Sequence, residues 1–182
     1  MVTKIFKTTG VIFLLLTLWA CPIKPDCPGE LEMYIPDLVS VVPLDTVYHV
    51  GDEIIYTAVI PSRIDSLNID IYEDTGTTST MLGGSEISKF DGNYIEVFKG
   101  NTRRIGDDNT LVAYVTYNPV DKFYEFQARI TFTRSGEYKI FTDGMQVQIP
   151  KKNSKCAQYE IETNIRGFQI HSGEIWEFRV VP

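Results

Sequence analysis

Few residues of this chain combine the types and spacing that catalysis or metal binding requires. The two histidines, His49 and His171, each stand alone in a strand-like segment, without the neighbours of a motif such as His-Glu-x-x-His. The chain contains no Gly-x-Ser-x-Gly elbow, and it contains no phosphate-binding or dinucleotide-binding motif. We therefore expect no catalytic residue, no cofactor and no metal site, and we interpret both histidines as surface residues.

Carboxylates are the most abundant candidate ligands. Asp70, Glu73 and Asp74 end one predicted strand, and Asp107-Asp108-Asn109 fills a predicted loop. Hard oxygen ligands on loops suit Ca²⁺, but Asp-x-Asp-x-Asp spacing is missing from both groups, so we interpret them as solvated turn residues. A glycosidase needs two carboxylates placed across a cleft. The sequence of a β-protein does not show such placement, so the possibility of a glycosidase site stays open.

The first 21 residues form the most informative stretch of the sequence. Lys4 and Lys7 precede an apolar run over residues 11–18, which is too short for a stop-transfer helix, and Leu18-Trp19-Ala20-Cys21 follows. This arrangement resembles the lipobox of type II signal peptides in bacterial lipoproteins. The resemblance implies a signal peptide over residues 1–20 and lipidation of Cys21 by a diacylglyceryl thioether and an N-acyl chain. An ordinary secretory signal or an uncleaved anchor is the alternative.

Two further cysteines and a proline-rich segment follow the lipobox. Three prolines between residues 22 and 28 predict an extended tether over residues 21–30, which carries a single domain over residues 31–182. With Cys21 assigned to the lipid, two cysteines remain, Cys27 and Cys156. In an oxidising envelope compartment these two are candidates for a disulfide. Two free or buried thiols are the alternative.

The charge balance restricts the partners. The chain has 24 acidic against 17 basic residues, a net charge of −7, and the signal segment holds two of the lysines. Nucleic acids and anionic lipid surfaces need a basic partner, so neither is expected to bind the domain itself. Pro22 stands where an aspartate retains lipoproteins at the inner membrane of enteric-type bacteria, which favours the outer membrane. Whether the domain faces the periplasm or the cell surface stays open.

Beyond residue 30 the hydrophobic pattern is that of β-strands. Residues 122–133 alternate strictly between apolar and polar, as a half-buried antiparallel strand does, whereas residues 53–60 are apolar on both faces, as in a central strand. Further short strands are expected at residues 68–72, 94–98, 111–117, 138–141, 145–149, 158–162, 167–171 and 174–180. The pattern predicts an all-β fold, an antiparallel β-sandwich of around ten strands.

Turn signals support this fold class. Asp143-Gly144 is the strongest tight-hairpin signal, Asp91-Gly92-Asn93 and Ser172-Gly173 are weaker ones, and Asn118-Pro119 ends a strand. Ser135-Gly136-Glu137-Tyr138 resembles the approach to a strand of immunoglobulin-like domains, where a tyrosine hydrogen-bonds back across the corner. That resemblance implies an immunoglobulin-like sandwich.

The turn formed by Val50-Gly51-Asp52 before a hydrophobic strand resembles bacterial surface sandwich domains. In style, residues 21–182 are similar to uncharacterised β-rich lipoproteins of the Bacteroidota. Asp45-Thr46-Val47 and Asp65-Ser66-Leu67 resemble the O-glycosylation sequon of envelope proteins in that phylum. The resemblance makes Thr46 and Ser66 candidate acceptors, and both should then be exposed.

Aromatic residues could also contact a ligand. The chain has ten tyrosines, ten phenylalanines and two tryptophans, most of them on predicted core faces. Phe123 lies on the polar face of its strand and Tyr48 lies near a turn, which is too few for a sugar-binding platform. We expect a membrane-anchored, non-catalytic binding or structural module. A glycan-binding or glycan-processing accessory protein, and an assembly factor or inhibitor docking on another envelope protein, are the alternatives.

Overall fold

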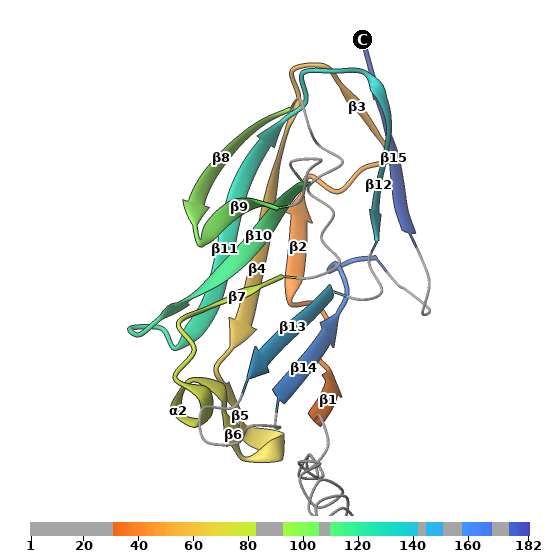
Figure 1. Ribbon diagram of the computed structural model, residues 1–182. Coiled ribbons are helices and arrows are strands. Elements are labelled where there is room, and N and C mark those ends of the chain that lie inside the picture. Colours follow the sequence, from red (N-terminus) through yellow and green to blue (C-terminus); the bar gives the residue numbers. More distant parts are fainter. Residues whose placement is uncertain (1–30, 83–92, 106–109, 142–144, 151–157, 169–174) are drawn as a thin grey trace, which may run out of the picture.

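The computed structural model describes residues 31–82, 93–105, 110–141, 145–150, 158–168 and 175–182 (Figure 1). The chain is predominantly β, as the sequence predicted. The strands are β1 (Leu31–Tyr34), β2 (Val39–Val42), β3 (Val47–His49), β4 (Glu53–Pro61), β5 (Arg63–Ile64), β6 (Ile69–Asp70), β7 (Ser79–Met81), β8 (Tyr94–Lys99), β9 (Asn101–Ile105), β10 (Thr110–Asn118), β11 (Phe123–Thr131), β12 (Gly136–Phe141), β13 (Met145–Pro150), β14 (Gln158–Thr163) and β15 (Ile175–Val181), and the short helices are η1 (Asp65–Leu67) and α2 (Ile71–Thr75).

A seven-stranded sheet forms the centre of the fold. Its order is β2-β4-β11-β10-β7, with β8 also on β11 and β9 also on β10. Strand β4 lies between β2 and β11, which confirms the central position predicted for residues 53–60. The alternation predicted for β11 is also confirmed, because Tyr124, Phe126, Ala128 and Ile130 are fully buried while the residues between them are not.

The main sheet forks along β11. Strand β10 pairs with the beginning of β11, up to Thr116 opposite Glu125, and β8 pairs with the remainder from Gln127 onward. Strand β9 follows β10 along the other branch. Gly100 joins β8 to β9, so the chain passes there from the branch along β11 to the branch along β10.

Two smaller sheets complete the fold, with orders β1-β14-β13 and β12-β15-β3, and β5 pairs with β6. The prediction of a wholly antiparallel fold is wrong at two places, since β1 is parallel to β14 and β3 is parallel to β15. Both pairs join an early strand to a late one. Local sequence patterns carry no information on such distant pairing, because it depends on how the intervening sheet brings the ends together.

One hydrophobic cluster extends from Val39 to Val180 and joins the sheets. Its aromatic part lies where the end of β11 meets the sheet of β12, β15 and β3, and the ring of Phe132 lies 5.1 Å from Tyr48 and 5.5 Å from Phe178. Residues Trp176, Phe178 and Val180 share the buried face of β15, as predicted. The Tyr138 hydroxyl donates to the Arg134 carbonyl at 2.9 Å, so the predicted hydrogen bond back across the corner is present.

A helical turn replaces the strand predicted at residues 68–72. Only Ile69–Asp70 is extended, and α2 begins directly afterwards. The Asp70 carboxylate caps α2 by accepting from the Glu73 backbone N–H, and Gly76 ends the helix in the left-handed conformation. Among the residues that the structure describes, no helix is long and apolar enough to cross a membrane.

Other turn predictions had mixed outcomes. Asn118 ends β10 as predicted, and the turn at Gly51 leads into β4 as predicted. Asp143-Gly144 lies outside the described residues, but the hairpin prediction is wrong because β12 pairs with β15 and β13 pairs with β14. A strand was predicted over residues 167–171, but Gly167 lies in a turn, and the residues from 169 on lie outside the described part of the chain. The turn signals at Asp91-Gly92 and Ser172-Gly173 also lie outside it.

Candidate functional site

The residues predicted to carry chemistry do not come together in the described part of the chain. Cys21, Cys27, Cys156, His171 and Asp107-Asp108-Asn109 lie outside it. His49 is exposed, as expected, and its ring Nδ1 lies 3.8 Å from Asp52 Oδ2, while its backbone N–H donates to the same carboxylate at 2.7 Å. This contact stabilises the turn before β4.

The carboxylates around α2 have structural roles. Asp70 accepts from the Ser62 hydroxyl at 2.9 Å in addition to capping α2, and Asp74 accepts from the Tyr159 hydroxyl at 2.8 Å. Burial and the Asp74 carboxylate raise the pKa of Tyr159 to about 12, which keeps this hydroxyl a donor. In the described ranges, no three His, Cys, Asp or Glu side chains are grouped so that they could hold a metal ion.

Both candidate glycan acceptors are accessible. Thr46 lies directly before β3 and Ser66 lies in η1, and both are exposed, as the sequon prediction required. Thr46 also lines a shallow, open depression on the sheet of β12, β15 and β3. The Arg179 Nε beside it is 2.7 Å from Glu137 Oε1, so this arginine is already paired within the chain.

The strongest candidate for a binding surface is the side of β4, β8 and β11 that faces away from the core. We call it the outer face. Cross-strand register places residues directly opposite one another on the same side of a sheet. The outer face consists of Glu53, Ile55, Thr57 and Val59 of β4, Tyr94, Glu96, Phe98 and Lys99 of β8, and Phe123, Glu125, Gln127, Arg129 and Thr131 of β11.

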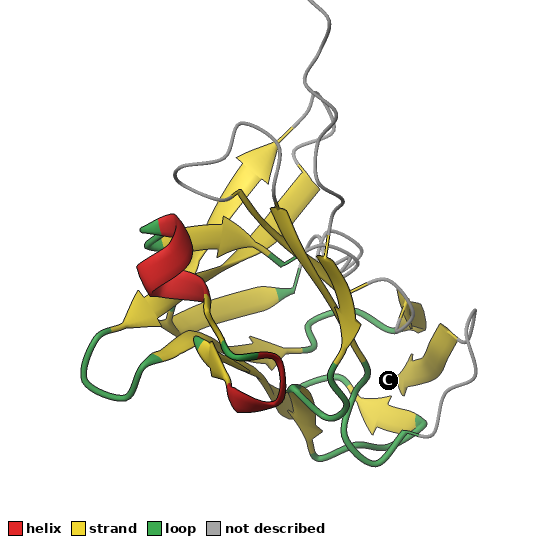
Figure 2. Ribbon diagram, turned by 90° about the horizontal axis from the view of Figure 1, so that it is seen from below, coloured by secondary structure: helices red, strands yellow, loops and turns green. Residues whose placement is uncertain are grey.

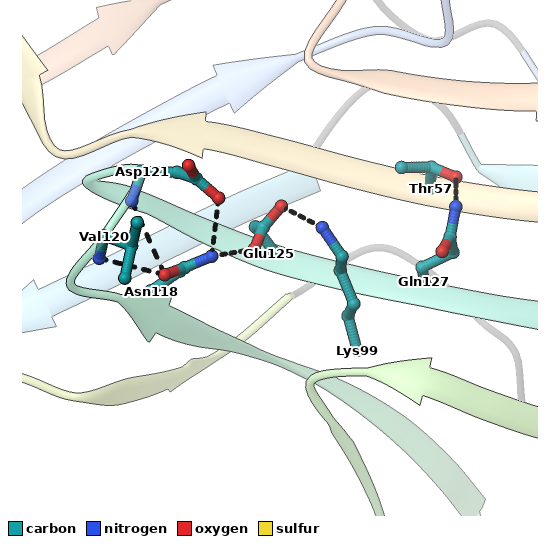
Figure 3. A network of polar contacts seen from close by, with 7 residues as sticks. All are labelled: Thr57, Lys99, Asn118, Val120, Asp121, Glu125 and Gln127. Carbon is teal, nitrogen blue, oxygen red and sulfur yellow. Dashed lines mark hydrogen bonds and ion pairs between the residues drawn. The ribbon is translucent and has the colours of Figure 1, made fainter.

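A polar network fixes one end of the outer face (Figure 3). Glu125 accepts from Lys99 Nζ at 2.5 Å and from Asn118 Nδ2 at 2.9 Å, and Asn118 Oδ1 accepts from the backbone N–H of Val120 at 3.0 Å. Asn118 Nδ2 also donates to Asp121 at 2.8 Å. The hairpin between β10 and β11, the start of β11 and the end of β8 are therefore held in one arrangement.

This network predicts a pH-dependent contribution to stability. The hydrogen bonds from Lys99 and then Asn118 lower the pKa of Glu125, so the ionised form is favoured in the folded state. We expect Glu125→Gln to lose about 0.5–1 kcal/mol at pH 7, because Lys99 is half exposed and the pair is screened. The pKa of Glu125 is lower in the folded state than its value of about 4.3 in the unfolded state. The difference in stability between the wild type and Glu125→Gln is therefore complete at pH values above the unfolded-state pKa, and it disappears as the pH falls through the folded-state pKa.

Urea unfolding of the wild type and Glu125→Gln at a series of pH values measures this difference. Glu137→Gln is a matched control, since it removes a more exposed glutamate that is also in an ion pair, with Arg179 instead of a lysine. A difference at Glu125 that stays constant from pH 7 to below the lowered pKa would contradict the prediction.

Arg129 occupies the middle of the outer face. Its guanidinium lies 5.3 Å from the centre of the Phe98 ring, 3.3 Å from Glu96 and 3.5 Å from Glu53, which itself accepts from the Thr131 hydroxyl. A register shift beside Gln127 gives β8 an extra residue, so Phe98 lies on the same side as Arg129. The outer face therefore carries the planar guanidinium of Arg129 in contact with two carboxylates and with an exposed aromatic ring.

Exposed aromatic residues lie along this face, although not where the sequence placed them all. Phe123 is 36% exposed, as predicted, and Tyr94 and Phe98 are 61% and 47% exposed. Tyr48 lies near a turn, as predicted, but it is only 2% exposed, so the expectation that it lies outside the core is wrong. Its hydroxyl donates to the Pro43 carbonyl at 2.7 Å and accepts from the Asp45 N–H at 2.8 Å, which satisfies it within the core.

Sequence reasoning identified Phe123 but missed Tyr94, Phe98 and Arg129. The exposure of Phe98 depends on the bulge in β8, for which the sequence has no turn residue as a signal. Comparison with known proteins gives no further guide to this surface. No protein-family model matches the chain, and no curated protein or solved structure is significantly similar to it.

Proposed function

We propose that this protein is a bacterial envelope lipoprotein, anchored to the outer membrane by lipid on Cys21, whose domain is a non-catalytic binding or structural module. The observation that carries the anchor is the lipobox-like Leu18-Trp19-Ala20-Cys21 at the end of an apolar run. Each buried methylene of an acyl chain contributes about 0.8 kcal/mol, so two or more chains hold a protein at a membrane without any spanning helix.

The position of the first strand supports this arrangement. Strand β1 begins at Leu31, ten residues after Cys21, and it lies at one end of the long axis of the domain, opposite the C-terminus (Figure 1). A lipid on Cys21 would therefore leave the far end of the domain, with β3 and the end of β15, directed away from the membrane.

The outer face supports a binding role. It combines exposed aromatic rings, an arginine between two carboxylates, and a hairpin fixed by the Asn118 network. Arginine and aromatic residues are over-represented where proteins bind one another. Because the polar groups are already positioned by contacts within the chain, a partner would meet a surface that loses little side-chain freedom on binding.

An immunoglobulin-like sandwich is the finer description that we propose for the domain. The hydrogen bond between Tyr138 and the Arg134 carbonyl supports it, since it has the form of a corner tyrosine. The aromatic contacts between Phe132 at the end of β11 and Phe178 of β15 also support it, because they join two layers of strands. Figure 2, which shows the domain from below, shows strands that run in different directions and do not form one flat layer.

Cell fractionation and protease shaving test the anchor. Wild type, Cys21→Ala and Cys27→Ala are compared in intact and lysed cells, and Cys27→Ala is the matched control because it removes a cysteine outside the lipobox. We expect Cys21→Ala alone to leave the membrane fraction. If Cys21→Ala still fractionated with the membrane as an equally processed protein, the anchor would be wrong. Digestion in intact cells would place the domain on the surface, and protection until lysis would place it in the periplasm.

A glycan-handling role is the second candidate. Tyr94, Phe98 and Phe123 offer exposed rings of the kind that stack on sugars, but β11 separates Phe123 from Thr131, the partner of Tyr94, by eight residues, about 27 Å. The rings therefore do not form one short platform. A protein partner, which covers a larger area, fits this spacing better. Loss of binding to cell-wall glycan on Phe98→Ala, with binding retained in Phe123→Ala, would instead favour the glycan role.

The two sequons give a prediction about modification that is independent of the anchor. If the sequons are used, protein purified from the native envelope will be heavier than its lipidated chain from residue 21 onward, and the excess will fall stepwise in Thr46→Ala, Ser66→Ala and the double variant. Intact-mass spectrometry measures each step. Thr133→Ala is the matched control, since Thr133 is exposed but does not follow an aspartate. A wild-type mass equal to that of the lipidated chain alone would contradict the prediction without affecting the anchor.

A further inference from the structure

We propose that the parallel pair of β1 and β14 is a mechanical clamp that carries force from the N-terminal tether into the domain. This inference goes beyond the proposed function. The load on the clamp rests on the proposed tether, but the pulling test measures the folded domain alone, so a failure of the clamp and a failure of the lipid anchor are distinguishable.

The first observation is the geometry of the pair. Four residues of β1 are in register with β14, from Leu31 opposite Tyr159 to Tyr34 opposite Glu162, and the Ile35 N–H extends the ladder to the Glu162 carbonyl at 2.9 Å. The chain enters β1 at one end of the domain and leaves β15 at the other (Figure 1). Ladder hydrogen bonds run across the strands, so a pull along β1 loads them together, whereas a pull across β1 breaks them in turn.

The second observation is a polar lock directly after β1. Asn164 is 8% exposed, and its Oδ1 accepts from the Asp37 N–H at 2.7 Å and from the Tyr34 hydroxyl at 3.2 Å. Its Nδ2 donates to Asp37 Oδ1 at 3.1 Å, and to the carbonyls of Ile165 and Phe168. The lock holds the segment between β1 and β2 against the end of β14.

The third observation is the continuation into the main sheet. The Leu38 N–H donates to Thr163 Oγ1 at 3.1 Å, the Arg166 N–H donates to the Val39 carbonyl at 2.7 Å, and Val39 is fully buried. Strand β2 then pairs with the central strand β4. Force on the tether thus passes through the ladder, the lock and the central sheet without a break in the contacts.

Single-molecule pulling tests the clamp. The chain from residue 21 onward with Cys21→Ser retains every described element, and it receives one handle at residue 30. The second handle is at Pro182 for an axial pull, or at the exposed Ser66 of η1, which lies at the same end as β1, for a transverse pull. We expect the axial unfolding force to exceed the transverse force about two-fold or more at one loading rate, because the ladder bonds then share the load.

Two variants separate the clamp from general stability. Asn164→Ala removes the lock, and Val115→Ala removes buried apolar volume in β10, away from the clamp. Their equilibrium stabilities are measured by urea unfolding, so that the forces are compared at similar loss of stability. We expect Asn164→Ala to lower the axial force and Val115→Ala to leave it nearly unchanged. Equal axial and transverse forces, or an axial force that falls equally in both variants or does not fall in Asn164→Ala, would overturn the proposal.

Discussion

Replacing Gly100 by alanine will destabilise the domain by about 3 kcal/mol or more, because two separate costs coincide at this residue. Its φ of +75° lies in the left-handed region, which costs an alanine about 1–2 kcal/mol. A Cβ atom would also lie 2.5 Å from the Tyr114 carbonyl oxygen and 2.9 Å from the Glu125 carbonyl oxygen. Both are backbone atoms of paired strands. Tyr114 is paired with β7 and β9, and Glu125 is paired with β4 and β10, so neither carbonyl can move without disturbing these pairings.

Gly51→Ala is the matched control for this prediction. Gly51 has a φ of +100°, but a Cβ there would meet no atom within 4 Å, so only the backbone cost applies. Urea unfolding of both variants separates the two contributions, and we expect Gly51→Ala to lose about 1–2 kcal/mol. If Gly100→Ala lost no more stability than Gly51→Ala, the close approach of the two branches at Gly100 would be wrong.

Local periodicity predicted the strands whose pattern is set by one buried face. The alternation of β11 and the aromatic face of β15 are confirmed because each side chain there has only the core or the solvent to face. The pattern misled at residues 68–72, where Ile69 and Ile71 alternate with polar residues. The missed signal was Asp70 three residues before Glu73, with Gly76 beyond, which is the sequence of a capped helical turn.

Contacts between distant segments could not be predicted in this way. The hairpin signal at Asp143-Gly144 describes a turn, but it says nothing about whether its flanking strands pair with each other or with β15 and β14. Likewise, Phe98 reaches the outer face through a bulge whose partner strand begins 25 residues later in the sequence, at Phe123. The outer face, the fork and the clamp all depend on such pairings, so the sequence identified their strands but not the surfaces.

Asn164 is the residue at which this dependence on distant contacts is strongest, and Asn164→Asp will cost about 3–5 kcal/mol at pH 7. The substitution keeps the shape of the side chain but replaces the amide donor by an oxygen. That oxygen would face Asp37 Oδ1 and the carbonyls of Ile165 and Phe168, all of which now accept from Nδ2. Asn164→Ala will cost less, about 2–3 kcal/mol, because it leaves these groups unsatisfied without adding a buried charge.

The pH dependence of Asn164→Asp identifies the cause of its loss. Burial beside carbonyl oxygens and Asp37 raises the pKa of the introduced carboxyl in the folded state above its unfolded value of about 3.9. The folded state then binds the proton more tightly, so the loss is complete above the raised pKa and shrinks as the pH falls toward the unfolded value. Urea unfolding at pH 7 and at lower pH, with Asn164→Ala as reference, measures this convergence.

Asn68→Asp controls for the change in net charge, since Asn68 is exposed at the end of η1 and its left-handed backbone also tolerates aspartate. We expect it to lose less than about 0.5 kcal/mol at pH 7. A loss at Asn164→Asp that is as small as this, or that does not shrink relative to Asn164→Ala at low pH, would mean that Asn164 does not lock the segment after β1. The N-terminal strand would then be held by its ladder with β14 and by the hydrogen bonds that join Leu38 to Thr163 and Val39 to Arg166.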